Sequence, residues 1–112
     1  MSMSSAVIDL GVEEVAAGLA DGTILLVDVR EPHEQARGTI PGSLSMPLSR
    51  FDPAALPAAE GRRLVFSCAA GVRSRIAIEA ARRAGLEVGA HLAPGFKGWA
   101  AAGMPVARPT IG

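Results

Sequence analysis

Short apolar runs separated by amphipathic stretches give the chain its main pattern. Five runs have the length and the aliphatic or β-branched content of strands. They occupy residues 7–10, 23–29, 43–48, 62–68 and 86–93. The run TILLVDV at 23–29 is almost entirely aliphatic, which is typical of a strand covered on both faces within a parallel sheet. All five runs fall short of the roughly 20 apolar residues that a membrane span needs.

Helical signals fill the intervals between the strands. Residues 11–22 carry apolar side chains at helical spacing, and Pro32 suits the first position of a short helix. The stretch 74–85 predicts a longer helix and 94–106 a short one. The apolar face of the 74–85 helix is expected to contain Ile76, Ala77, Ala80, Ala81 and Ala84. Because parallel strands need crossover helices, the pattern predicts an α/β fold with a small, mostly parallel five-stranded sheet flanked by helices.

The composition suits a single domain over residues 1–112. The chain has 112 residues and is 49% hydrophobic, so a second core would leave each half too small. Eleven basic and eleven acidic side chains give a formal net charge of zero, which is unlike the charge of a nucleic-acid binder. The opening MSMSSAV lacks the basic and long apolar parts of a secretory signal. We therefore expect residues 1–5 to be a flexible N-terminus, and the location to be cytoplasmic, without nucleic-acid or membrane partners.

Cys68 is the single cysteine and carries the candidate chemistry. One cysteine cannot form an internal disulfide, and with only His33 and His91 beside it a zinc site is not expected. Cys68 stands between a predicted strand and a predicted helix, at the sheet edge where ligands bind in such folds. It is either a buried, inert thiol or a reactive one.

The sequence CAAGVRS favours the reactive thiol. Small residues let the loop curl so that its backbone N–H groups and the free N–H groups of the helix converge, and Gly71 can take a positive φ. These donors and the charge of Arg73 are expected to lower the pKa of Cys68. Packing alone would not require such a loop. The candidate substrate-binding residues are Ala69, Ala70, Gly71, Val72, Arg73 and Ser74.

Two reaction classes use a thiolate in a loop of this kind, phosphoryl transfer and sulfur transfer through a persulfide. Cysteine-dependent phosphatases place an arginine six positions after the cysteine, where it clamps the phosphate. In this chain that position is Ser74, with Arg73 and Arg75 on either side. The spacing therefore favours sulfur transfer, and phosphatase or arsenate-reductase activity is a weaker alternative.

Three motifs in order resemble the rhodanese-like family of single-domain sulfurtransferases. They are LLVDVREPHEQARGTIPGS, CAAGVRS and APGFKGWAAAGMPV, and together they extend over nearly the whole chain. The resemblance implies that Cys68 is the catalytic nucleophile that carries the persulfide, and that Asp28 and Arg30 support the site. Thr39 and Ser43 depart from the histidine and alanine usual in the family's turn. Ala69 and Ala70 stand where thiosulfate-preferring members often have basic side chains.

The resemblance implies a transferase that moves a sulfane sulfur from a donor such as thiosulfate or a persulfide to a thiol or cyanide acceptor, without a metal or organic cofactor. The two alanines motivate an alternative, a sulfur-relay or protein-binding module that turns over free donors slowly and works with a sulfur-carrying protein. A preformed thiolate needs no base, so neither His33 nor His91 is assigned to catalysis. Trp99 is interpreted as a core or rim residue.

Overall fold

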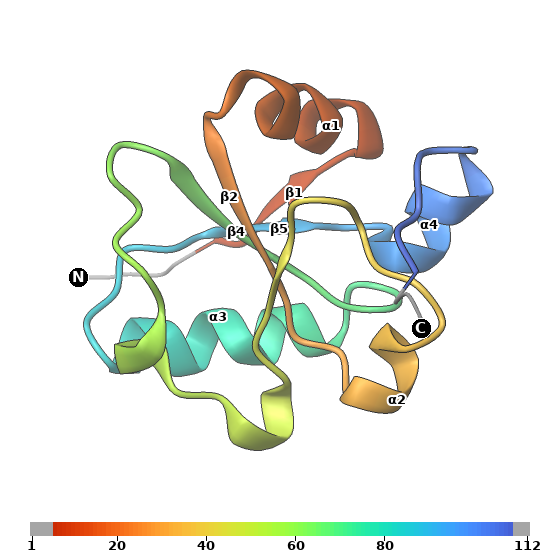
Figure 1. Cartoon of the computed structure of the whole chain (residues 1–112). Helices are drawn as coiled ribbons and strands as arrows, with labels where there is room; N and C mark the ends of the chain where they lie inside the picture. Colours follow the sequence, from red (N-terminus) through yellow and green to blue (C-terminus); the bar gives the residue numbers. More distant parts are fainter. Residues whose placement is uncertain (1–5, 109–112) are drawn as a thin grey trace.

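A parallel five-stranded sheet forms the centre of the computed structural model, which describes residues 6–108 (Figure 1). Its strand order is β1-β5-β4-β2-β3, and every pairing is parallel. The strands are β1 (Ile8–Leu10), β2 (Ile24–Asp28), β3 (Leu44–Ser45), β4 (Arg63–Ser67) and β5 (Ala90–Leu92). This confirms the predicted α/β sheet. The expectation for residues 1–5 lies outside the described residues.

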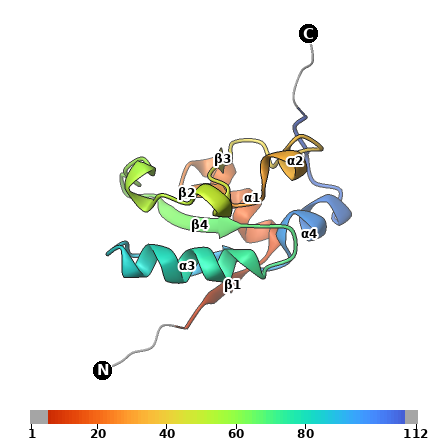
Figure 2. The same ribbon diagram turned by 90° about the horizontal axis from the view of Figure 1, so that it is seen from below.

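Helices cover both faces of the sheet. They are α1 (Val12–Asp21), α2 (Pro32–Gln35), α3 (Arg73–Arg83) and α4 (Gly95–Ala101), with two short 3-10 helices at Leu48–Arg50 and Pro53–Ala55. In Figures 1 and 2, α1 and α3 lie on opposite sides of the sheet. Over residues 6–108, none of the helices has both the length and the apolar character needed to cross a bilayer.

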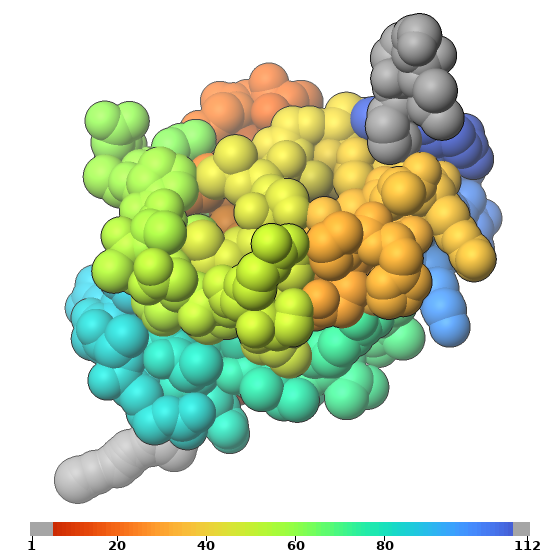
Figure 3. Space-filling model, turned by 60° about the horizontal axis from the view of Figure 1, so that its bottom comes forward, coloured from red at the N-terminus to blue at the C-terminus, as the bar shows by residue number. Residues whose placement is uncertain are grey.

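Two apolar cores lie on the two faces. On the α1 face, Val15 packs with Leu26, Val65 and Trp99, all at most 3% exposed. On the α3 face the core contains the residues Val27, Val29, Phe66, Cys68, Ala77, Ile78, Ala81 and Val88. The segment around the 3-10 helices adds partly buried side chains to this second core, and Figure 3 shows it beside α3. Cys68 therefore belongs to the core beneath α3.

The predicted apolar face of α3 is wrong in one main respect. Ile76 is 50% exposed, whereas Ile78 is fully buried. The buried stripe consists of Ser74, Ala77, Ile78 and Ala81, and Ala84 is exposed. Ala77 and Ala81 belong to both the predicted and the observed stripe. Their positions are therefore compatible with either isoleucine facing the sheet. The large Ile78 side chain fills the core, and Ile76 is left on the solvent side.

Candidate active site

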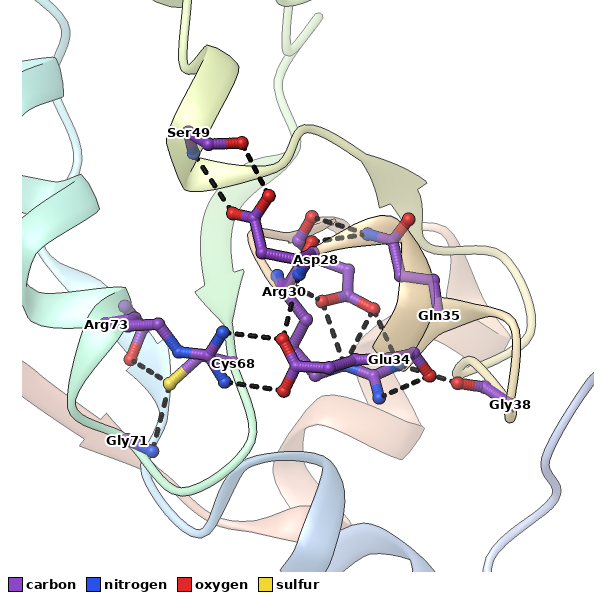
Figure 4. Close-up of polar contacts among 11 residues, drawn as sticks. Asp28, Arg30, Glu34, Gln35, Gly38, Ser49, Cys68, Gly71 and Arg73 are labelled. Atoms are coloured by element: carbon purple, nitrogen blue, oxygen red, sulfur yellow. Dashed lines mark hydrogen bonds and ion pairs between the residues drawn. The ribbon is translucent and has the colours of Figure 1, made fainter.

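The sulfur of Cys68 lies where β4 ends and the chain turns into α3. The residue is 1% exposed. The Gly71 N–H donates a hydrogen bond to Sγ over 3.1 Å (Figure 4). Ser74 Oγ is 3.5 Å from Sγ. The structure thus brings the predicted nucleophile together with the glycine and the serine of the predicted loop.

Gly71 has the conformation that the loop requires. Its φ of +88° lies in the region that side chains disfavour. A Cβ at this position would stand 2.3 Å from the carbonyl oxygen of Ala93. Only glycine allows the loop to lie this close to Ala93, which follows β5. In this conformation the Gly71 N–H points at Sγ and donates to it.

The start of α4 binds the carbonyl groups of the loop. The Phe96 N–H donates to the Cys68 carbonyl over 2.7 Å, and the Lys97 N–H donates to the Ala69 carbonyl over 3.0 Å. Gly95 makes this approach possible, because a Cβ there would lie 2.4 Å from the Ala69 oxygen. These two hydrogen bonds hold the backbone of the loop against the start of α4.

These contacts set the ionisation of Cys68. Burial alone raises the pKa of the thiol, because a thiolate is poorly solvated in an apolar core. Hydrogen bonds from the Ser74 side chain and from the backbone N–H groups of Ser74, Ala70 and Gly71 favour the anion. Their combined effect is larger, and the pKa of Cys68 is lowered. The loop can therefore hold a thiolate nucleophile.

Arg73 is engaged by an acidic side chain. Its Nη1 and Nη2 donate to the Glu34 carboxylate over 2.6 and 2.8 Å (Figure 4). The Arg73 hydrogen bonds lower the pKa of Glu34 to about 2, and the same contact raises the pKa of Arg73. The charge of a Cys68 thiolate raises the pKa of Arg73 further. Arg73 thus lies close enough to Cys68 to act on it, with its charge largely balanced by Glu34.

Asp28 and Arg30 form a buried network beside the loop. The guanidinium of Arg30 donates to the Asp28 carboxylate over 2.9 Å and to the Gly38 carbonyl over 2.6 Å. It also lies 4.1 Å from the ring centroid of Phe96, at the start of α4. The geometry is that of an ion pair that braces the turn and α4, which in turn hold the loop.

His91 lies at the site, although sequence reasoning did not assign it there. It is 1% exposed, its Nδ1 is 2.6 Å from Ser74 Oγ, and its Nε2 is 2.7 Å from an oxygen of Asp9. A histidine inside an apolar strand run is itself a signal, because such a residue needs polar partners when buried. His33 is exposed, and Trp99 is a core residue whose Nε1–H donates to the Pro105 carbonyl. Among residues 6–108, no cluster of three or more His, Cys, Asp or Glu side chains is arranged to hold a metal ion.

Comparison with known proteins identifies relatives over most of the chain. An uncharacterized protein of Synechocystis is 42% identical over 85 residues, which cover 76% of this chain and 48% of that protein. The chain therefore spans about half the length of that relative. Human thiosulfate:glutathione sulfurtransferase is 35% identical over 100 residues, covering 77% of this chain and 87% of the human protein.

A solved structure and a family profile match the same part of the chain. The structure of a human single-domain sulfurtransferase superimposes with a TM-score of 0.70 at 33% identity, and covers 86% of this chain and 97% of that one. The sequence profile of the rhodanese-like domain matches residues 11–102. This span contains the sheet from β2 to β5, the Cys68 loop and α4. The chain therefore belongs to the rhodanese-like domain family.

Proposed function

We propose that the protein is a sulfurtransferase that moves a sulfane sulfur from a donor, such as thiosulfate or a persulfide, to a thiophilic acceptor through a Cys68 persulfide. One observation carries the proposal: Sγ is buried and its pKa is nevertheless lowered by the Ser74 hydroxyl and the loop N–H groups. A thiolate in such a site is a nucleophile toward divalent sulfur. The name of the human relative, thiosulfate:glutathione sulfurtransferase, supports the same reaction class.

The reaction runs in two displacements. In the first, the Cys68 thiolate forms a bond to the outer sulfur of the donor, and the bond between that sulfur and the rest of the donor breaks. The rest of the donor leaves with the electron pair, as sulfite when the donor is thiosulfate. In the second, an acceptor thiolate or cyanide takes the outer sulfur and Cys68 leaves as a thiolate. The Gly71 N–H and the Ser74 hydroxyl stabilise Sγ as charge returns to it. No step requires a cofactor.

The loop favours donors that need no extra cation. Ala69 and Ala70 carry no charge, and Arg73 is already paired with Glu34. This favours the second candidate, a relay module that takes sulfur from a persulfide on another protein. Val72, which is 69% exposed on the same loop, offers apolar contact to such a partner. The expected cytoplasmic location is part of both proposals.

Intact mass after incubation with a donor tests the sulfurtransferase proposal. Wild-type protein is expected to gain one sulfur atom from thiosulfate or glutathione persulfide, and to lose it to cyanide as thiocyanate. The Cys68→Ser variant, which keeps the loop and lacks the thiol, is the matched control. If the wild type gains no sulfur from any small or protein donor, or if Cys68→Ser gains as much, the proposal fails.

The same experiment separates the alternatives. Sulfur gained only from a persulfidated protein, and not from small donors, favours the relay module. Hydrolysis of p-nitrophenyl phosphate that depends on Cys68 would instead support a phosphatase, which Ser74 at the arginine position argues against.

A further inference from the structure

A chain of polar contacts runs from the sulfur of Cys68 through the sheet to an exposed carboxylate. Sγ is 3.5 Å from Ser74 Oγ, Ser74 Oγ is 2.6 Å from His91 Nδ1, and His91 Nε2 is 2.7 Å from Asp9 Oδ1. The residues come from the end of β4, from α3, from β5 and from β1. We propose that Ser74, His91 and Asp9 form a relay that takes the proton of Cys68 and keeps the sulfur as a thiolate. The relay deepens the proposed function and rests on Cys68 being its nucleophile.

The hydrogen positions define two states of the relay. In the thiol state, the Cys68 S–H donates to Ser74 Oγ, the Ser74 O–H donates to His91 Nδ1, and the His91 Nε2–H donates to Asp9. In the thiolate state, the Ser74 O–H donates to Sγ and the His91 Nδ1–H donates to Ser74 Oγ. His91 Nε2–H keeps its bond to Asp9 in both states.

The two states contain the same number of protons and differ in where one of them lies. Ser74 takes the proton from sulfur and gives its own to Nδ1, so the net change is from thiol and neutral imidazole to thiolate and imidazolium. The heavy atoms need not move, because each contact is already made. Every donor has an acceptor in both states, so neither state leaves a buried polar group unsatisfied.

Two groups that carry negative charge flank His91 in the thiolate state. An imidazolium formed on His91 lies between the Asp9 carboxylate and the Cys68 thiolate, which both stabilise it. Ser74 is fully buried and His91 is 1% exposed, so water screens the interaction with the Cys68 sulfur little. The β4 residue that pairs with His91 is Phe66, an apolar residue that brings no charge of its own.

Two arginines lie near the ends of the relay. From α3, Arg75 reaches the same Asp9 oxygen over 3.3 Å, with a side chain that is 52% exposed. Arg73 stands on the Cys68 side with its charge paired to Glu34. Since Asp9 is 58% exposed, it connects the buried relay to solvent. Arg75 touches only this outer end.

In this scheme Ser74 contacts the reacting sulfur, whereas His91 and Asp9 are positioning residues that act through it. The relay explains how a sulfur in an apolar core starts each cycle as a thiolate. It also explains why a histidine occupies an otherwise apolar strand. A purely structural role for His91 would need only a side chain that forms a hydrogen bond with Ser74.

The test measures the pH dependence of Cys68 alkylation by iodoacetamide, which needs no sulfur donor. His91→Asn is the decisive variant, because the Asn amide nitrogen can still donate to Ser74 but cannot take a proton. We expect the midpoint of the alkylation profile to rise by about one pH unit, which means about tenfold less thiolate at a fixed pH below the midpoint. Asp9→Asn should also raise the midpoint, by less than His91→Asn does. Arg75→Gln, the control at the outer end, should shift it less than Asp9→Asn does.

An unchanged midpoint in His91→Asn and in Asp9→Asn would overturn the relay. If His91→Asn does not fold, Asp9→Asn at its exposed position decides the question. The relay and the proposed function fail separately, because the relay is read from alkylation and the function from sulfur gain. A shifted midpoint with no sulfur gain from any donor would keep the relay and refute the sulfurtransferase.

Discussion

Gly71 offers a prediction whose magnitude follows from the geometry of the loop. In Gly71→Ala, the new Cβ must occupy a positive φ of +88° and would stand 2.3 Å from the carbonyl oxygen of Ala93. Backbone oxygen cannot yield as the tip of a side chain does, so the loop must move. Moving it pulls the Gly71 N–H away from the Cys68 sulfur.

The expected loss has two parts. Alanine in the left-handed region costs roughly 1–2 kcal/mol. Losing the hydrogen bond to a charged sulfur adds about 1.5–3 kcal/mol. Gly61→Ala is the matched control, because Gly61 has a φ of +85° but nothing within 4 Å of its Cβ position. Gly61→Ala should therefore lose only the stability that alanine at a positive φ costs.

Urea unfolding measures the stability of both variants. The signal is the fluorescence of Trp99, which is the single tryptophan and is 3% exposed. With a slope of about 1–3 kcal/mol per molar urea, the extra loss in Gly71→Ala lowers the midpoint by about 1 M relative to Gly61→Ala. The alkylation midpoint of Cys68 should rise in Gly71→Ala only. Equal urea midpoints, together with an unchanged alkylation profile, would refute the reasoning that the loop depends on glycine at 71.

Two further predictions concern the ion pair beside the loop and the buried face of α3. The pKa of Glu34 is lowered from 4.5 to about 2 in the folded protein. The pair with Arg73 therefore stabilises the fold fully above pH 4.5, and this stabilisation is lost as the pH falls toward 2. Glu34→Gln should therefore be less stable than wild type by about 1 kcal/mol at neutral pH, and urea midpoints should converge near pH 2; a gap that does not change with pH would contradict this. Ile78→Ala should lose about 2–5 kcal/mol, and Ile76→Ala less than about 0.5 kcal/mol; equal thermal midpoints for the two would show that the buried face has been misassigned.

Local signals in the sequence predicted much of the fold. The aliphatic runs at 23–29 and 62–68 contain β2 and β4, and Pro32 is the first residue of α2. The predicted strands at 43–48 and 86–93 are shorter in the structure, where β3 and β5 have two and three residues. The loop after Cys68 was predicted because its small residues, its glycine and its following helix are contiguous in the chain. Such features are set by neighbouring residues, so they can be read without knowing the strand order.

The missed features depend on contacts between distant segments. Glu34 meets Arg73 across 39 positions, and Asp9 meets His91 across 82. The second contact exists because β1 is the edge strand beside β5, and the hydrophobic pattern does not specify this strand order. His91 was therefore judged by its sequence neighbours alone, and its role at the site went unrecognised.

The neighbouring position of β1 and β5 also bears on how the protein is made. Synthesis produces Cys68 and its loop before the residues of β5 and α4. Until those residues emerge and β5 pairs with β1, Ser74 lacks its partner His91, and the loop lacks the two α4 N–H groups that hold its carbonyls. The groups that lower the pKa of Cys68 are therefore made before the groups that hold its loop in place, and the site is complete only after β5 and α4 have docked.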